Sequence, residues 1–163
     1  MGVDAYPPYI EESKRKNIHD EYILSDIMKV DFPEKSFDAV IAAQVIEHVN
    51  SEDAAILIKR MERWAKKKVL MTTPNCQTGF VPTQAGHGHT EGFDRYGDSA
   101  LMSHKSGWTV DAFENLGYRV RGYDGFERFY GKPGFGRVLY NLSFPFSYFF
   151  PRHARQLLAM KDL

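Results

Sequence analysis

Two apolar runs, separated by enough residues for one helix, constrain the fold of this chain more than any other feature. Residues 37–46, FDAVIAAQVI, are almost all apolar, which is typical of a central parallel strand buried on both faces. Residues 69–73, VLMTT, form a second strand-like run that Pro74 closes. A strand, a helix and a strand joined by short links predict a parallel sheet with right-handed crossovers.

The segment between these runs has the pattern of an amphipathic helix. Asn50 and Ser51 can cap its start, and Glu52 and Asp53 follow in the first turn, where the helix dipole favours acids. Apolar residues then recur every three or four positions, at Ala54, Leu57, Ile58, Met61, Trp64 and Ala65. We expect residues 66–68, three lysines, to form the solvated end of this helix.

The segments before and after this strand–helix–strand unit continue the alternation of strands and helices. Residues 2–4, GVD, and residues 22–26, YILSD, are short apolar runs that each end in an acid. Near residue 109 a threonine can cap a short helix with Phe113 and Leu116 facing inward, and Gly117 supplies its left-handed stop. Residues 118–122 alternate like an edge strand.

Length, charge and cysteine content limit the classes of protein to which this chain can belong. With 163 residues the chain can form one domain with a real core. It has 21 basic and 21 acidic residues, so no net field attracts it to nucleic acid, and we expect no such partner. A single cysteine, Cys76, excludes an internal disulfide, and no signal-peptide pattern opens the chain, so we expect a cytoplasmic protein.

One apolar segment near the C-terminus leaves two interpretations open. Residues 138–150, VLYNLSFPFSYFF, carry no charge and have basic flanks. They are too few to span a bilayer, which takes about 20 apolar residues. The segment is either a core strand with a lid, or an aromatic surface that contacts a membrane or an apolar substrate.

Several of these motifs together resemble a known family. The run FPEKSFDAVIAAQVIEHV is similar to the fourth-strand signature of class I S-adenosylmethionine-dependent methyltransferases, especially the small-molecule, type 11/12-like enzymes related to the ubiquinone group. GVDAY, LSDI and KKVLMTTPN match the flanking motifs in order, and SHKSGWTVDAFENLGYRVRG matches more loosely. The resemblance implies a Rossmann-like, three-layer α/β sandwich with a mostly parallel sheet.

The resemblance also implies where S-adenosylmethionine, or its product S-adenosylhomocysteine, would bind. Asp4 would accept hydrogen bonds from the ribose hydroxyls, with Ala5 or Tyr6 beside the adenine. Asp26 would accept from the adenine amine, with the Ile27 backbone next to it. Gln44 would approach the methionine portion. The alternative interpretation of Asp4 and Asp26 is that they are turn formers or helix caps.

Three residues are candidates for the base that methyl transfer to a hydroxyl requires. His48 follows Glu47 at the end of the fourth-strand motif, and the carboxylate could raise the basicity of the imidazole or share a divalent ion with it. His104 lies where the substrate loop should return. Each histidine could instead satisfy local backbone groups. His87, His89 and Glu91 form only a weak metal pattern, and we expect no metal.

The family's glycine-rich first motif does not occur in this sequence, so we expect a chain that is N-terminally truncated relative to the family. Its open sheet edges would favour a homodimer. We expect a methyltransferase-like domain over residues 1–125, with a lid at 76–107, and an aromatic-rich extension over 126–163. The expected function is methyl transfer to a small-molecule or glycan/lipid-linked acceptor. A non-catalytic partner subunit and an NAD-dependent oxidoreductase are the alternatives.

Overall fold

The computed structural model describes residues 1–78 and 103–163, and these fall into two compact units. Residues 1–33 belong to the first unit, and residues 34–78 and 104–163 belong to the second. The predicted boundary at residue 125 falls inside a strand of the second unit. The predicted lid lies mostly outside the described residues.

The first unit is a small parallel pair of strands with one helix. Strand β1 (Gly2–Asp4) pairs with β2 (Tyr22–Leu24), so that Asp4 lies opposite Leu24. Helix α1 (Pro7–Arg15) connects them and begins with prolines, which fit the first helical turn because no intrahelical partner is lost there. The two short apolar runs are strands, as predicted.

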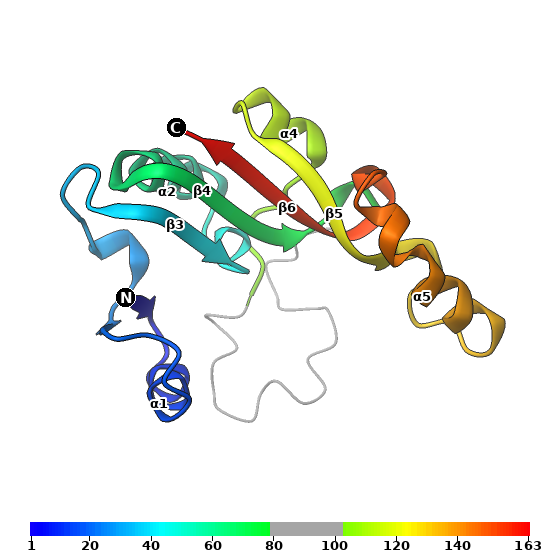
Figure 1. The fold of residues 1–163 in the computed structure, drawn as a ribbon, viewed down its shortest axis with the longest axis horizontal. Coiled ribbons are helices and arrows are strands. Elements are labelled where there is room, and N and C mark those ends of the chain that lie inside the picture. The colour runs from blue at the N-terminus through cyan, green and yellow to red at the C-terminus, as the bar shows by residue number, and fades with distance from the viewer. Residues whose placement is uncertain (79–102) are drawn as a thin grey trace. The chain divides into compact units, whose positions relative to one another are not determined.

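The second unit is built on a four-stranded sheet (Figure 1). Its strands are β3 (Phe37–Ala43), β4 (Ala65–Pro74), β5 (Arg119–Phe126) and β6 (Ala154–Asp162), in the spatial order β3-β4-β6-β5. β3 and β4 are parallel, and β6 is antiparallel to both β4 and β5. Three of the four strands therefore share one direction. The predicted α/β class with a mostly parallel sheet is confirmed.

One face of this sheet carries the core. Helix α2 (Ser51–Trp64) and helix α4 (Val110–Asn115) lie on this face, because Lys161 of β6 donates both to Glu62 of α2 at 2.9 Å and to the Leu116 carbonyl after α4 at 3.1 Å. The predicted apolar stripe of α2 is buried as expected, at Ala54, Leu57, Ile58, Met61 and Trp64, together with Ala65. On the strands, Val69, Met71, Val120, Leu157 and Ala159 are buried as well.

Three predictions about exposure or boundaries are wrong. β3 is not buried on both faces, because it lies at an edge of this sheet and Ile41 remains 66% exposed. Lys66–Lys68 extend β4, where Lys67 pairs with Asp38 and Lys68 with Asp162. Leu116 is 41% exposed because α4 ends before it, whereas Phe113 is fully buried.

The aromatic C-terminal segment is a helix and not a core strand. Helix α5 (Phe135–Ser147) connects β5 to β6 and packs against β5. The core-strand interpretation fails because a short apolar run does not distinguish strand from helix by periodicity alone. No helix among the described residues is long and apolar enough to cross a membrane.

Candidate active site

A sharp turn places Glu47 and His48 at the carboxyl end of β3. Gln44 follows the strand with a φ of 54°, a left-handed conformation that is uncommon for a residue other than glycine. Its backbone N–H still donates to the Thr72 carbonyl on β4 at 3.0 Å. A short 3-10 helix, Ile46–His48, comes next, and its fully buried Ile46 anchors the turn in the core. Backbone strain of this kind is concentrated at functional sites.

Hydrogen bonds hold the distant His104 segment against this turn. The N–H groups of Lys105 and Ser106 both donate to the Glu47 carbonyl, at 2.7 and 3.1 Å. The Ser106 hydroxyl donates to the Ile46 carbonyl at 2.9 Å and accepts from the Trp108 indole at 3.1 Å. These bonds fix the position of His104 beside residues that precede it by more than fifty positions in the chain.

The three predicted catalytic residues therefore converge. One nitrogen or oxygen of each of Glu47, His48 and His104 lies within 4.8 Å of those of the other two. The two imidazole rings meet edge to face, with centroids 4.9 Å apart. We call these three side chains the Glu–His–His cluster.

Burial sets the charge state of this cluster. Glu47 is only 1% exposed, and this burial raises the pKa of its carboxyl to about 7. Burial, and secondarily the neighbouring His48, lowers the pKa of His104. At neutral pH His104 is therefore a neutral imidazole, which can accept a proton, beside a carboxyl that titrates in the same range.

Gln44 links the cluster to the ends of the other strands. Its amide fits best with the nitrogen donating to Glu47 Oε1 at 3.1 Å and the oxygen accepting from the Tyr123 hydroxyl of β5 at 3.2 Å. Glu47 Oε2 has no hydrogen-bond partner among the described residues. A buried carboxylate oxygen without a partner costs free energy unless a ligand or ion supplies one.

Sequence reasoning missed Tyr123 as a neighbour of the site. Tyr123 pairs with Gln156 of β6, and both side chains reach Gln44. No local signal could have found them, because β6 inserts between β4 and β5 only in the folded sheet.

Two kinds of chemistry suit the Glu–His–His cluster. Two imidazoles next to a carboxyl can accept a proton from a bound hydroxyl or amine and stabilise the resulting cation. The same donor set, two nitrogens and one oxygen, also suits a divalent first-row metal ion. The weaker pattern of His87, His89 and Glu91 lies outside the described residues.

The predicted nucleoside ligands lie in the first unit. Asp4 ends β1, and its Oδ1 accepts from the Tyr6 N–H at 2.7 Å. Asp26 caps a short 3-10 helix that begins at Ile27, and its Oδ1 accepts from the Met28 N–H at 2.9 Å. Both acids thus make the local bonds of a turn or cap. In each, the second carboxylate oxygen retains acceptor capacity for a ligand.

Comparison with known proteins gives a sequence match over part of the chain and a shared fold. Residues 1–72 match the family model described as a methyltransferase domain. A search of curated proteins finds no match. Among solved structures, the chain resembles a SAM-dependent methyltransferase from Archaeoglobus fulgidus, with a TM-score of 0.58 and 16% identity over 99% of this chain and 75% of that one.

Two further structures share the fold. An S-adenosylmethionine-dependent methyltransferase from Mesorhizobium loti aligns with a TM-score of 0.54 and 16% identity, over 99% of this chain and 79% of that one. Phosphoethanolamine N-methyltransferase 1 from Haemonchus contortus, solved with phosphoethanolamine and S-adenosylhomocysteine, aligns with a TM-score of 0.55 and 12% identity, over 98% of this chain but only 33% of that one. The family match covers residues 1–72, which is less than half of the chain, and the likeness to these structures at 12–16% identity shows a shared fold.

Proposed function

We propose that this chain transfers the methyl group of S-adenosylmethionine to a hydroxyl or amine of a small-molecule or glycan/lipid-linked acceptor, with the Glu–His–His cluster at the acceptor. The observation that carries the proposal is the convergence of Glu47, His48 and His104 at the carboxyl ends of co-directional strands. Ligands of open α/β sheets bind at that edge.

The residues that would hold the cofactor fit its polar groups. Asp4 ends β1 and Asp26 follows β2, and each keeps one carboxylate oxygen outside its local hydrogen bond. Carboxylates in this position suit ribose hydroxyls and an exocyclic amine. When bound, S-adenosylmethionine supplies a methyl group already activated on a sulfonium.

The protein's remaining task is to orient the acceptor and remove its proton. His104 is neutral at pH 7, because burial lowers its pKa, so it can take the proton that the acceptor loses as its oxygen or nitrogen is methylated. Glu47, within 4.8 Å, stabilises the imidazolium that forms. Gln44 holds Glu47 in place through the hydrogen bond to Oε1.

The test combines cofactor binding with a matched pair of histidine variants. Calorimetric titration with S-adenosylhomocysteine measures whether the folded chain binds the cofactor product. Transfer of a labelled methyl group to extracted glycolipids and small metabolites then measures turnover. His104→Ala should lower the rate about 10²- to 10⁴-fold, the usual contribution of a general base. His153→Ala removes an exposed imidazole outside the cluster and should leave the rate unchanged.

Equal rates for the two variants would remove the cluster from the chemistry. Loss of transfer in the presence of a chelator would replace the base assignment with a metal-ion role for the same three side chains. A folded chain that does not bind S-adenosylhomocysteine would instead favour the non-catalytic partner subunit. That alternative has one observation behind it, the exposed Ile41 on β3, which has a neighbouring strand on one side only in the described sheet.

A further inference from the structure

Helix α5 buries two serines and leaves most of its apolar side chains exposed. Its buried residues are Ser143 and Ser147. The Ser143 hydroxyl accepts from the Phe126 N–H of β5 at 2.8 Å, and a Cβ on Gly122 of β5 would come within 2.3 Å of the Ser147 carbonyl. The helix therefore packs closely against β5 through Ser143, Ser147 and Tyr140, and its exposed apolar residues differ from those of an ordinary amphipathic helix, which faces its apolar side to the core.

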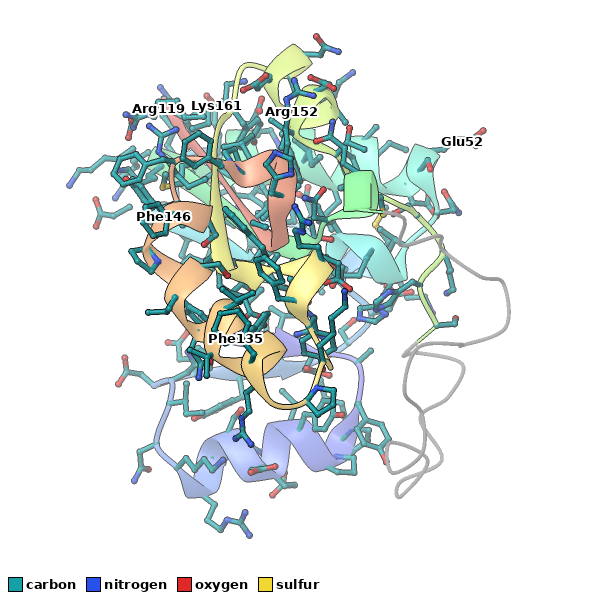
Figure 2. All side chains as sticks on the ribbon, turned by 90° about the vertical axis from the view of Figure 1, so that its right-hand side faces the viewer. Glu52, Arg119, Phe135, Phe146, Arg152 and Lys161 are labelled. Atoms are coloured by element: carbon teal, nitrogen blue, oxygen red, sulfur yellow. The ribbon has the colours of Figure 1, made fainter. Side chains whose placement is uncertain are left out.

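The outward side of α5 is a continuous apolar stripe. Phe135 is 74% exposed, Leu142 61%, Phe146 56% and Phe149 73%. These residues, with Val138 and Phe150, recur every three or four positions and so share one side of the helix and of the turn after it. Figure 2 shows the labelled Phe135 and Phe146 along this helix. We call the six residues the aromatic face. An exposed apolar patch of this kind marks an interaction site.

The segment of chain that contains the aromatic face carries charge of a single sign. Residues 128–155 include five basic residues and no Asp or Glu, although the whole chain is neutral. Arg152 pairs with Asp111, and Arg155 pairs with Asp124 at 3.0 Å. Arg128, Lys132 and Arg137, which lie just before or within α5, form no ion pair with any other residue that the structure describes. These three are available to an external anion.

We infer that α5 lies in the interface of a membrane that contains anionic lipid, with the aromatic face among the acyl chains and Arg128, Lys132 and Arg137 at the phosphates. Exposed aromatic residues with basic neighbours have the chemistry of interfacial helices, which lie in the plane of the membrane. A helix of 13 residues is about 20 Å long and suits this orientation, not a transmembrane one. A symmetric contact between two copies would instead bring the like charges of both copies together.

Vesicle flotation tests this inference without any cofactor or acceptor, so its outcome is separate from that of the proposed function. The full chain is mixed with vesicles of pure phosphatidylcholine, or of phosphatidylcholine with one quarter phosphatidylglycerol. We expect flotation with the anionic vesicles, weaker flotation at high salt, and little with the neutral ones. The double variant Phe146→Ser/Phe149→Ser should bind about tenfold more weakly or worse, because two exposed apolar anchors are lost. Arg137→Glu should also weaken binding to the anionic vesicles.

The control variant is Ile56→Ser, which removes an apolar residue of α2 that is 46% exposed and lies outside the aromatic face. It should float like the unchanged chain. Failure of the unchanged chain to float with anionic vesicles would overturn the inference. A dimer in sedimentation that dissociates in the Phe146→Ser/Phe149→Ser variant would also overturn it, because a second copy would then cover the aromatic face. Equal flotation of the Phe146→Ser/Phe149→Ser variant and the unchanged chain would also overturn the inference.

Discussion

At the residue scale, the buried Glu47 makes stability depend on pH. Its folded pKa, about 7, lies above the ordinary value of 4.5, so the folded state holds a proton that the unfolded state releases between these values. Stability should therefore fall as pH rises from about 4.5 to 7, by on the order of 3 kcal/mol. Glu47→Gln should remove this slope. The comparison is denaturant unfolding at pH 5 and pH 8 in the presence of a chelator.

The control for this prediction is Glu52→Gln, which changes an exposed carboxyl in the first turn of α2. This variant should keep the slope of the unchanged protein. If Glu47→Gln and the unchanged protein lose stability in parallel between the two pH values, Glu47 is ionised in the folded state and the charge assignment of the cluster is wrong.

Phe113 tests the core beneath the site at the same scale. Its ring is fully buried and stacks on Trp108, with centroids 5.0 Å apart. Phe113→Ala should lower the free energy of unfolding by about 3–5 kcal/mol, because it removes a large buried side chain and leaves a cavity. Phe135→Ala makes the same change at a side chain that is 74% exposed and should cost almost nothing. Urea unfolding of both variants measures the difference, and similar losses would contradict the packing of α4.

At the element scale, α2 depends on its cap. The Asn50 side chain accepts from the Asp53 N–H at 2.9 Å, which satisfies a donor that has no intrahelical partner. Asn50→Ala should destabilise the protein by about 1 kcal/mol. Asn141→Ala, an exposed position inside α5, should be neutral or slightly stabilising because alanine favours helix. A denaturation midpoint that moves equally in the two variants would show that the cap contributes nothing.

Local sequence patterns predict some elements of the fold correctly and leave others ambiguous. The start of α2, its buried stripe and the ends of β1 and β4 follow from local rules of capping and periodicity, and the structure has them. The Lys66–Lys68 run was assigned to a helix end because charge suits both a helix end and an exposed strand. Residues 138–150 fit both strand and helix, and in the structure they are helical as far as Ser147, with Ser143 and Ser147 buried. Local pattern carries no information about such contacts.

The candidate site was predictable to a similar extent. Glu47 and His48 are adjacent in the chain, so the resemblance to a family motif was enough to single them out. His104 was predicted from a looser motif, and the hydrogen bonds of Lys105 and Ser106 to the Glu47 carbonyl explain why it lies there. Tyr123 was missed because its position depends on a strand that follows it by thirty residues.

At the scale of the whole molecule, the last strand determines whether the sheet can form. β6 lies between β4 and β5 and pairs with both, so these two strands have no direct contact through hydrogen bonds. Leu157 and Ala159 of β6 are fully buried in the core. β4 and β5 can therefore become part of one sheet only when β6 is present between them. The pairs that β6 makes join residues that are far apart in the sequence.

Removal of residues 154–163 should accordingly abolish cooperative folding and not merely weaken it. The truncated chain would expose two unpaired strand edges, which favour aggregation, and would lose the core contacts of Leu157 and Ala159. Removal of Leu163 alone, which is 50% exposed, is the matched control and should leave the thermal transition nearly unchanged. Circular dichroism during heating shows whether each shortened chain keeps a cooperative transition. A sharp transition in the chain without residues 154–163 would mean that β4 and β5 can associate without β6, and that β6 is an addition to a sheet that is stable without it.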